Sequence, residues 1–237
     1  GIAHDFNNIL ASVIGYTELA LEQVAAGTIL NENLLEVRNA GDRAKELVRQ
    51  ILAVSRPEEQ VRRPIDIRPL VRESMKMLRA TIPSSISIQE EISKERLIVH
   101  ADPTQIHQVI MNLITNAVHA IQNNTGQLSV RVESVSADKC PDIQTSAPAA
   151  GHLAKIQVTD TGSGIPESIR EEIFKPYFTT KSRGLGTGLG LSVVHGIVTA
   201  HDGQIRFDSE PGKGTTFYVY LPLTPGGSPK LSDLKGG

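Results

Sequence analysis

The first 56 residues carry apolar side chains at the three- and four-residue spacing of amphipathic helices. The apolar stripe of the first helix consists of Phe6, Ile9, Leu10, Val13 and Ile14. A polar break follows at 27–33, and a second stripe continues from Leu34 to Val54 until Pro57 and Pro64 end it. This pattern predicts an antiparallel helical hairpin. Because one hairpin buries its stripes poorly, we expect two copies to form a four-helix bundle, as a homodimer.

From residue 65 onward, segments with helical spacing alternate with strand-like segments. The predicted helices cover 67–78, 102–121 and 189–200. The predicted strands cover 86–92, 97–100, 128–134, 153–160, 203–209 and 215–221. The helix at 102–121 has the strongest start signal, with Asp102 as N-cap, Pro103 in the first turn and Gln105 three residues after the cap. The segment 136–151 is expected to be a surface loop.

The pattern therefore predicts an α+β chain with three parts. A helical hairpin occupies residues 1–60, and a mixed domain of ordinary size follows at 61–223. The Gly/Pro/Ser-rich segment 224–237 is expected to be a flexible tail or linker. Because the chain begins inside a periodic apolar pattern without a capping signal, we expect it to belong to a longer protein.

Composition narrows the class of protein. With 39% hydrophobic and 21% charged residues, the 237-residue chain can form a packed core. A net charge of −2 provides no basic surface for nucleic acid or an anionic membrane, so we expect neither contact. The single cysteine, Cys140, excludes an internal disulfide framework and a multi-cysteine zinc site. Neither a bilayer-spanning run nor a signal peptide is present, so a cytoplasmic location is expected, which is compatible with a membrane-anchored parent protein.

Two asparagines interrupt the apolar helix predicted at 102–121. Asn112 and Asn116 are four residues apart and therefore share a face. They could simply lie on the solvent side of the helix. Alternatively, an amide oxygen could bind a hard cation such as Mg²⁺, which combines protein oxygens with phosphate and water. The pair alone favours the first interpretation.

Two glycine-containing segments lie beside predicted elements: the first follows a strand, and the second leads into a helix. Asp160–Pro166 could let the backbone approach a flat ligand while the carboxylate accepts a hydrogen bond from an amine, but an ordinary turn has similar composition. Gly184–Ser192 has glycines at alternate positions and leads into a helix, which favours an anion-binding loop over a flexible linker. Neither segment is a Walker A loop or a Gly-x-Gly-x-x-Gly fingerprint.

His4 lies on the first predicted helix, with Asp5 beside it and Asn8 one turn further on the same face. A lone helical histidine is usually an ordinary surface residue. A neutral imidazole is, however, a competent nucleophile when a neighbouring carboxylate fixes its tautomer and stabilises the developing charge. We expect the other histidines to be structural.

In their order along the chain, these segments resemble the motifs of a sensor histidine kinase catalytic core with a GHKL (Bergerat-type) ATP-binding domain. His4–Asn8 resembles the family's phosphoacceptor box, and Asn112–Ala117 resembles its asparagine box. Asp160–Gly164 and Gly184–Leu191 resemble its first and second glycine boxes. Phe174–Lys181 resembles its phenylalanine box, and Gly212–Thr215 resembles its closing turn. The His-Asp-Phe-Asn-Asn form and the loop at 136–151 resemble the hybrid-kinase branch, in which a receiver domain often follows. The resemblance covers residues 2–223.

The resemblance implies a dimerisation and phosphotransfer hairpin followed by an α/β sandwich of the Bergerat ATPase type. It implies ATP-dependent autophosphorylation on His4, with Asp5 as general base, and transfer to an aspartate of a response-regulator receiver domain, either separate or in the same parent chain. Asn8 would position water if the protein also dephosphorylates that partner. A dimeric, ATP- and Mg²⁺-dependent protein-histidine kinase of two-component signal transduction is therefore expected.

The resemblance also assigns the nucleotide site. Asn116 would bind Mg²⁺ with Asn112 beside the phosphates, and Asp160 would bind the adenine amine. The residues flanking the adenine would be Gly162, Gly164 and Thr215. The residues closing over the phosphates would be Lys181, Gly184, Gly186, Gly188 and Gly190. Three positions depart from the family pattern: Tyr177 stands where Phe is commoner, His119 where a charged residue is frequent, and Asp202 where glycine usually follows His201.

Two rival functions remain. The same ATP-binding fold serves gyrase-like, MutL-like and heat-shock chaperone ATPases, which have no need of His4 and Asp5 on a hairpin. A dimerisation scaffold with a vestigial nucleotide site is the other rival, and the intact Asn116, Asp160 and second glycine box argue against it.

Overall fold

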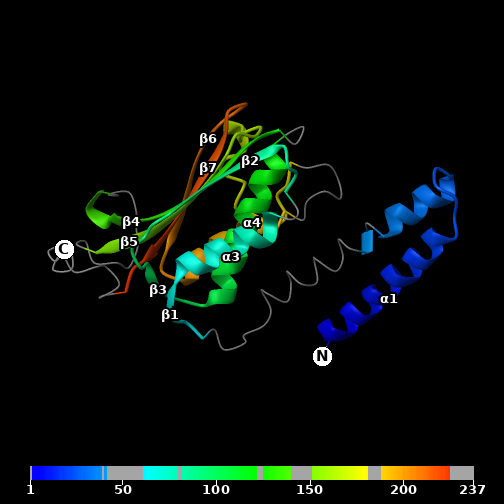
Figure 1. Ribbon diagram of the computed structural model, residues 1–237, viewed down its shortest axis with the longest axis horizontal. Helices are drawn as coiled ribbons and strands as arrows, with labels where there is room; N and C mark the ends of the chain where they lie inside the picture. Colours follow the sequence, from blue (N-terminus) through cyan, green and yellow to red (C-terminus); the bar gives the residue numbers. More distant parts are fainter. Residues whose placement is uncertain are drawn as a thin grey trace. The chain divides into compact units, whose positions relative to one another are not determined.

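The computed structural model describes residues 2–38, 40–41, 61–79, 82–121, 125–139, 151–180 and 188–224. The chain divides into two compact units. One comprises Gly1–Glu59 with Thr179–Leu189, and the other comprises Gln60–Phe178 with Gly190–Gly237 (Figure 1). Among the described residues, no helix combines the length and apolar character needed to cross a membrane.

The first unit contains the N-terminal helical hairpin. Helix α1 spans Ile2–Glu22, and a second helix is described over 29–38 and 40–41. The predicted polar break at 27–33 is too long, because Thr28 caps the second helix and helical structure begins directly after it. The Thr28 hydroxyl accepts the backbone N–H of Asn31 at 3.2 Å, which is the bond of a helix N-cap. The predicted continuation of this helix lies in 42–60, outside the described residues.

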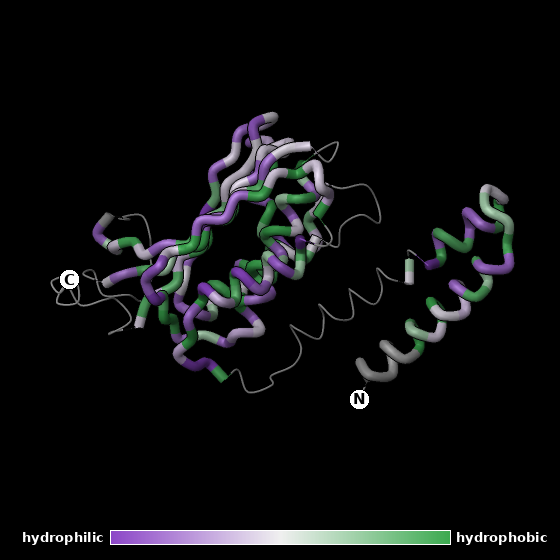
Figure 2. The backbone as a smooth tube through the Cα atoms, in the orientation of Figure 1, coloured by the Kyte–Doolittle hydropathy of each residue, from purple (hydrophilic) through white to green (hydrophobic). Residues whose placement is uncertain are grey.

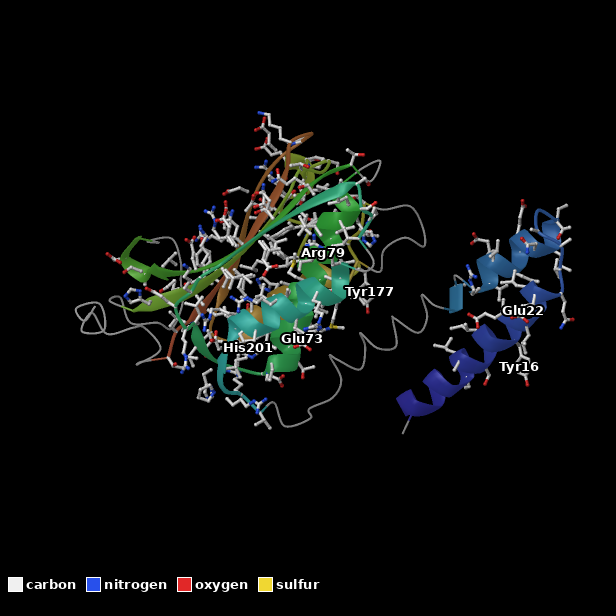
Figure 3. All side chains as sticks on the ribbon, in the orientation of Figure 1. Tyr16, Glu22, Glu73, Arg79, Tyr177 and His201 are labelled. Carbon is white, nitrogen blue, oxygen red and sulfur yellow. The ribbon has the colours of Figure 1, made fainter. Side chains whose placement is uncertain are left out.

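The two helices of the hairpin approach closely at one small residue. A Cβ atom placed on Gly41 would lie 2.8 Å from Cγ1 of Ile14, so a glycine at this position lets the helices meet. The opposite side of α1 is different, because Ile9, Val13 and Tyr16 are exposed there, Tyr16 by 75% (Figure 3). This exposed stripe on α1 is a large apolar surface for a single hairpin.

The second unit is built on a five-stranded sheet with the order β2-β4-β5-β7-β6. Its strands are β2 (Ile86–Ile92), β4 (Gly126–Ser136), β5 (His152–Asp160), β6 (Gln204–Glu210) and β7 (Gly214–Pro222). The β2–β4 pair is parallel, and the other three neighbouring pairs are antiparallel.

Among the described residues of this unit, three helices and a small second sheet accompany the large sheet. The helices are α3 (Ile67–Arg79), α4 (Pro103–Ala120) and α5 (Gly190–Ala200). Short 3₁₀ turns cover Ala137–Lys139 and Glu167–Ile169. Strand β1 (Arg63–Asp66) pairs with β3 (Ile98–Ala101) in an antiparallel two-stranded sheet. Figure 1 shows α3 and α4 packed on the same side of the large sheet, which makes a two-layer α/β sandwich.

The core lies between the two layers. Along β4, Leu128, Val130 and Val132 are buried at every second position, as expected of strands with one face toward a core. In α4, Ile110 and Leu113 are fully buried against them. Figure 2 shows hydrophobic residues gathered along α4 and the neighbouring strands. Much of the other face of the sheet is polar, and there Glu91 and Arg131 form an ion pair at 2.7 Å.

The predicted helices and strands of this unit are present, and the main shifts are at their ends. Strand β1 was not predicted, because a four-residue segment containing Pro64 has no measurable periodicity. At the start of α4, the Asp102 side chain accepts the N–H groups of Thr104 and Gln105, at 2.8 and 3.3 Å, which confirms the predicted N-cap.

Candidate functional site

Helix α4 presents a polar stripe to the start of α5. Asn112 and Asn116 are half-buried, and the Nδ2 atom of Asn112 donates to the carbonyl oxygen of Gly190 at 3.4 Å. A Cβ atom on Gly190 would lie 3.7 Å from Nδ2 of Asn116 and 3.9 Å from Oδ1 of Asn112. The pair therefore faces the N-terminus of α5 rather than lying on an exposed side of α4.

The same stripe continues to the end of α4, where it meets the loop after β5. The carbonyl oxygen of Ala120, four residues after Asn116, accepts the N–H of Ser163 at 3.0 Å. A Cβ atom on Gly162 would lie 2.4 Å from this oxygen, closer than any real contact, so only glycine fits. Helix α4 thus links the glycines at 162–164 to the N-terminus of α5.

Asp160 ends β5 at this loop and is almost fully buried. Its Oδ1 atom accepts the N–H of Gly162 at 2.8 Å and the N–H of Thr215 at 3.3 Å. Its Oδ2 atom receives no hydrogen bond from any residue that the structure describes. Burial raises the pKa of the Asp160 carboxyl, and the two backbone hydrogen bonds oppose that shift only in part.

Backbone packs directly on backbone around Asp160. A Cβ atom on Gly214 would lie 2.0 Å from the carbonyl oxygen of Asp160, and one on Gly164 would lie 2.2 Å from that of Glu210. Both glycines have positive φ, +114° and +69°. Glycine is therefore required at both positions, which brings the loop after β5 against the β6–β7 turn.

Together these groups can hold an anionic ligand that carries an amine-bearing ring. The N-terminus of α5 offers backbone N–H groups and a positive dipole for phosphate, and the Asp160 carboxylate offers an acceptor for an amine. The described residues include no cluster of three or more His, Cys, Asp or Glu that could bind a metal. A hard cation would therefore be held by the amide oxygen of Asn116 together with oxygens of the ligand, a donor set that suits Mg²⁺.

Several predicted residues belong to the other unit or lie outside the described residues. His4, Asp5 and Asn8 lie on α1, in the first unit. Lys181, Gly184 and Gly186 fall in 181–187, outside the described residues. Gly188 has a φ of +67°, a conformation that favours glycine. The structure thus assembles Asn112, Asn116, Asp160, Gly162, Gly164, Gly190 and Thr215.

The structure adds one residue that the sequence did not indicate. Ser209, on β6, lies opposite Thr215 in the strand register, and its Oγ atom is 2.9 Å from Oγ1 of Thr215. The alternation of Ile205 and Phe207 indicates that Ser209 also lies on the helix-facing side of β6. The sequence does not show which residues Ser209 contacts, because those contacts depend on how three strands pair.

Asp202 is one of the predicted departures from the family pattern, and the structure explains it. Its φ is +56°, a left-handed conformation in which glycine is common and aspartate is tolerated. Tyr177 is also left-handed, with a φ of +66°, and its side chain is exposed (Figure 3).

A separate concavity of about 600 Å³ lies beside β6. Its lining includes Lys155, Arg206 and Tyr218 but none of the predicted site residues. Lys155 forms an ion pair with Glu133 at 3.1 Å and lies 5.2 Å from the Tyr218 ring centre, so its charge is already compensated.

Two family models match the chain. Residues 101–225 match the "Histidine kinase-, DNA gyrase B-, and HSP90-like ATPase" family, and residues 1–60 match the "His Kinase A (phospho-acceptor) domain".

Curated relatives match nearly the whole chain. A sensor kinase, CckA, of Brucella abortus is 37% identical over 223 residues, which cover 94% of this chain and 23% of that protein. The sensor histidine kinase ZraS of Escherichia coli is 34% identical over 94% of this chain and 44% of its own length. This chain therefore spans less than half the length of these relatives.

A solved structure supports the same fold. The histidine kinase ThkA, in a crystal structure with the response regulator protein TrrA, superposes with a TM-score of 0.63 at 27% identity. The alignment covers 95% of this chain and 60% of that one.

Proposed function

Because this chain belongs to the histidine kinase family, we propose that it transfers the γ-phosphoryl group of ATP to His4 and then to an aspartate of a response-regulator receiver domain. The observation that carries this proposal is the convergence of the α4 asparagines, Gly190 and Asp160 in one unit with a phosphoacceptor hairpin in the same chain. Phosphoryl transfer depends mainly on positioning and charge neutralisation.

ATP would lie along the stripe of α4. Its phosphates would lie at the N-terminus of α5 with Asn112 beside them, because backbone N–H groups and the helix dipole favour anions there. Lys181 and the glycines at 184, 186 and 188 would close over the phosphates. The adenine would lie at Asp160, whose Oδ2 atom is available to accept from the exocyclic amine, with Gly162, Gly164 and Thr215 around it.

Mg²⁺ would be held by the amide oxygen of Asn116 and by phosphate oxygens. When bound, the ion neutralises charge on the phosphates during transfer. The place of Asn116 on α4, one turn from Asn112 and close to Gly190, supports this role. Asn116→Ala should therefore lose the Mg²⁺-dependent part of ATP binding, measured by calorimetry, while the fold is kept.

His4 would be the nucleophile. Asp5 would accept the second N–H of the imidazole and so stabilise the positive charge that develops on the ring. The match of residues 1–60 to a phospho-acceptor domain supports this assignment. The exposed apolar stripe on α1 supports the proposal that two hairpins pair as a four-helix bundle.

Transfer from phosphohistidine to a receiver aspartate is supported by the crystal structure of ThkA with its response regulator. Asn8, on the same helix as His4, would orient water if the protein also dephosphorylates its partner. An Asn8→Ala variant would then keep the kinase step and lose dephosphorylation of the receiver.

Incubation with γ-labelled ATP and Mg²⁺ separates this function from its rivals. Acid-labile, base-stable label on the protein supports a histidine kinase. Release of free phosphate without label on the protein supports a gyrase- or chaperone-like ATPase. Neither label nor release, in a chain that dimerises, supports a scaffold with a vestigial site.

A further inference from the structure

Three side chains form a row across β5, β7 and β6. Asp160 lies opposite Thr215 in the β5–β7 register, and Thr215 lies opposite Ser209 in the β7–β6 register. Directly opposed residues on neighbouring antiparallel strands bring their side chains into contact. Ser209 is four residues from the buried Ile205 on β6, and Thr215 is two residues from the buried Phe217 on β7. Residues an even number apart on a strand share a face, so the row lies on the helix-facing side of the sheet.

The Ser209 hydroxyl has three polar neighbours. It accepts the backbone N–H of Ile165 at 2.8 Å, lies 3.0 Å from the carbonyl oxygen of Gly214, and lies 2.9 Å from Oγ1 of Thr215. Arg170 donates to the Ser209 carbonyl oxygen, which helps to fix this residue in place.

These contacts define the direction of each hydrogen. A hydroxyl donates one hydrogen and accepts with two lone pairs. The Ile165 N–H can only donate, and the Gly214 carbonyl can only accept. All three contacts are hydrogen bonds only if Ser209 donates to Gly214 and the Thr215 hydroxyl donates to Ser209.

The Thr215 hydrogen is then directed away from the ligand, and its oxygen can only accept there. The Asp160 carboxylate beside it is also an acceptor. We propose that Ser209 is a positioning residue for base recognition: by holding the Thr215 hydrogen, it makes this end of the site accept a ring amino group and reject a ring carbonyl at the same position. The inference rests on the adenine-nucleotide function proposed above.

The comparison of ATP with ITP tests this role, because ITP carries a carbonyl where ATP carries the amino group. Dissociation constants of both nucleotides, with Mg²⁺, are measured by calorimetry for the full chain. In Ser209→Ala the Thr215 hydroxyl can rotate and donate to the carbonyl, so the preference for ATP over ITP should fall about three- to tenfold, the worth of one hydrogen bond. Ser209→Thr retains the hydroxyl and should restore the preference.

A double-mutant cycle makes the test specific. In a Thr215→Val background, Ser209→Ala should leave the ATP-to-ITP ratio unchanged, because the hydroxyl that Ser209 directs is absent. Thr216→Val is the matched control, since this neighbouring hydroxyl on β7 donates to Thr159 at 3.1 Å and lies on the other face of the strand.

An unchanged ATP-to-ITP ratio in Ser209→Ala, in a wild-type chain that binds ATP, would overturn the role of Ser209 alone. A change of the same size in the Thr215→Val background would overturn it equally. Failure of the wild-type chain to bind ATP would instead overturn the nucleotide function and, with it, this inference.

Discussion

The Nε2 atom of His201 accepts the backbone N–H of Asp102 at 3.1 Å, which joins the end of α5 to the N-cap of α4. The other ring nitrogen of His201, Nδ1, donates to the carbonyl oxygen of Ile197 at 2.8 Å. This arrangement requires a neutral imidazole. In a capping box the side chain three residues after the N-cap, here Gln105, would accept the N–H of the cap residue. His201 accepts the Asp102 N–H instead.

His201 makes stability depend on pH. Burial lowers the pKa of His201, and Arg62 lowers it further, whereas the hydrogen bond to Ile197 and the charges of Asp102 and Asp202 oppose this. Because the unfolded state binds the proton more readily, His201 contributes stability above its ordinary pKa of 6.5, and that stability is lost as pH falls through the lowered value.

We therefore predict that the free energy of unfolding decreases as pH falls below 6.5, with a slope of up to about 1.4 kcal/mol per pH unit from this group. Urea unfolding of wild type and His201→Gln at several pH values measures it. The difference between the two proteins should shrink toward acid pH. The exposed His195 gives the control His195→Gln, and parallel curves for wild type and His201→Gln would contradict the prediction.

Gly214→Ala should destabilise the protein by several kcal/mol, because its φ is +114° and a Cβ would collide with the carbonyl oxygen of Asp160. ATP affinity should fall with it. Gly212→Ala is the matched control: its φ is +78°, but a Cβ there meets nothing within 4 Å, so only about 1 kcal/mol of backbone strain is expected. Equal effects in thermal unfolding would show that the close approach at Gly214 does not matter.

ATP affinity should fall in acid as Asp160 is protonated. Burial raises the pKa of this carboxyl above its ordinary 3.8, so the loss of the acceptor begins at a higher pH than for an exposed aspartate. Calorimetry at several pH values compares wild type with Asp160→Asn, which should bind weakly throughout. Because Asp160→Asn lacks the carboxyl group, its pH dependence shows the effect of the titration of ATP itself. An identical pH dependence of ATP affinity in both proteins would contradict a role of Asp160 in adenine binding.

Much of the α/β unit could be predicted from sequence because its signals are local. Asp102 and Pro103 mark the start of α4 by side-chain capping and a fixed φ, and both act within one turn. Strand β1 escaped prediction because its partner β3 lies some 35 residues away and Pro64 is normally read as a breaker. The start of the second hairpin helix was placed too late, because the polar residues that follow Thr28 lie inside the helix.

The sequence can predict a site residue whose position follows from local signals, but not one whose role depends on the register between paired strands. Asp160 follows a strand directly, so its place at the end of β5 can be inferred from sequence. Ser209 is an ordinary serine in an ordinary strand, and its importance arises only from the pairing of β6 with β7 and of β7 with β5. His201 likewise depends on a contact with Asp102, which is 99 residues away.

The exposed stripe on α1 should form a dimer interface. Val13→Glu places a charge within it and should raise the dimer dissociation constant about 100-fold or more, because each copy loses a buried valine. Light scattering at tens of micromolar measures this as a shift from dimer to monomer. Ala11→Glu adds the same charge on another exposed side of α1 and should leave the dimer intact. A monomeric wild-type chain at that concentration would contradict the proposal.

The roles of Asp5 and His4 can be separated by rate. Asp5→Asn should slow autophosphorylation by about 10²–10⁴-fold, the usual contribution of a general base, while ATP affinity stays at the wild-type level. Quenched-flow labelling and calorimetry measure the two quantities. A normal rate in this variant would exclude Asp5 as the base.

The most direct measurement of the central claim is acid-labile label from γ-labelled ATP on His4→Gln, compared with wild type and with His195→Gln. Wild type and His195→Gln should take up label that base leaves intact, and His4→Gln should take up none while binding ATP normally. Undiminished acid-labile label on His4→Gln would contradict the account and transfer the phosphoacceptor role to another histidine.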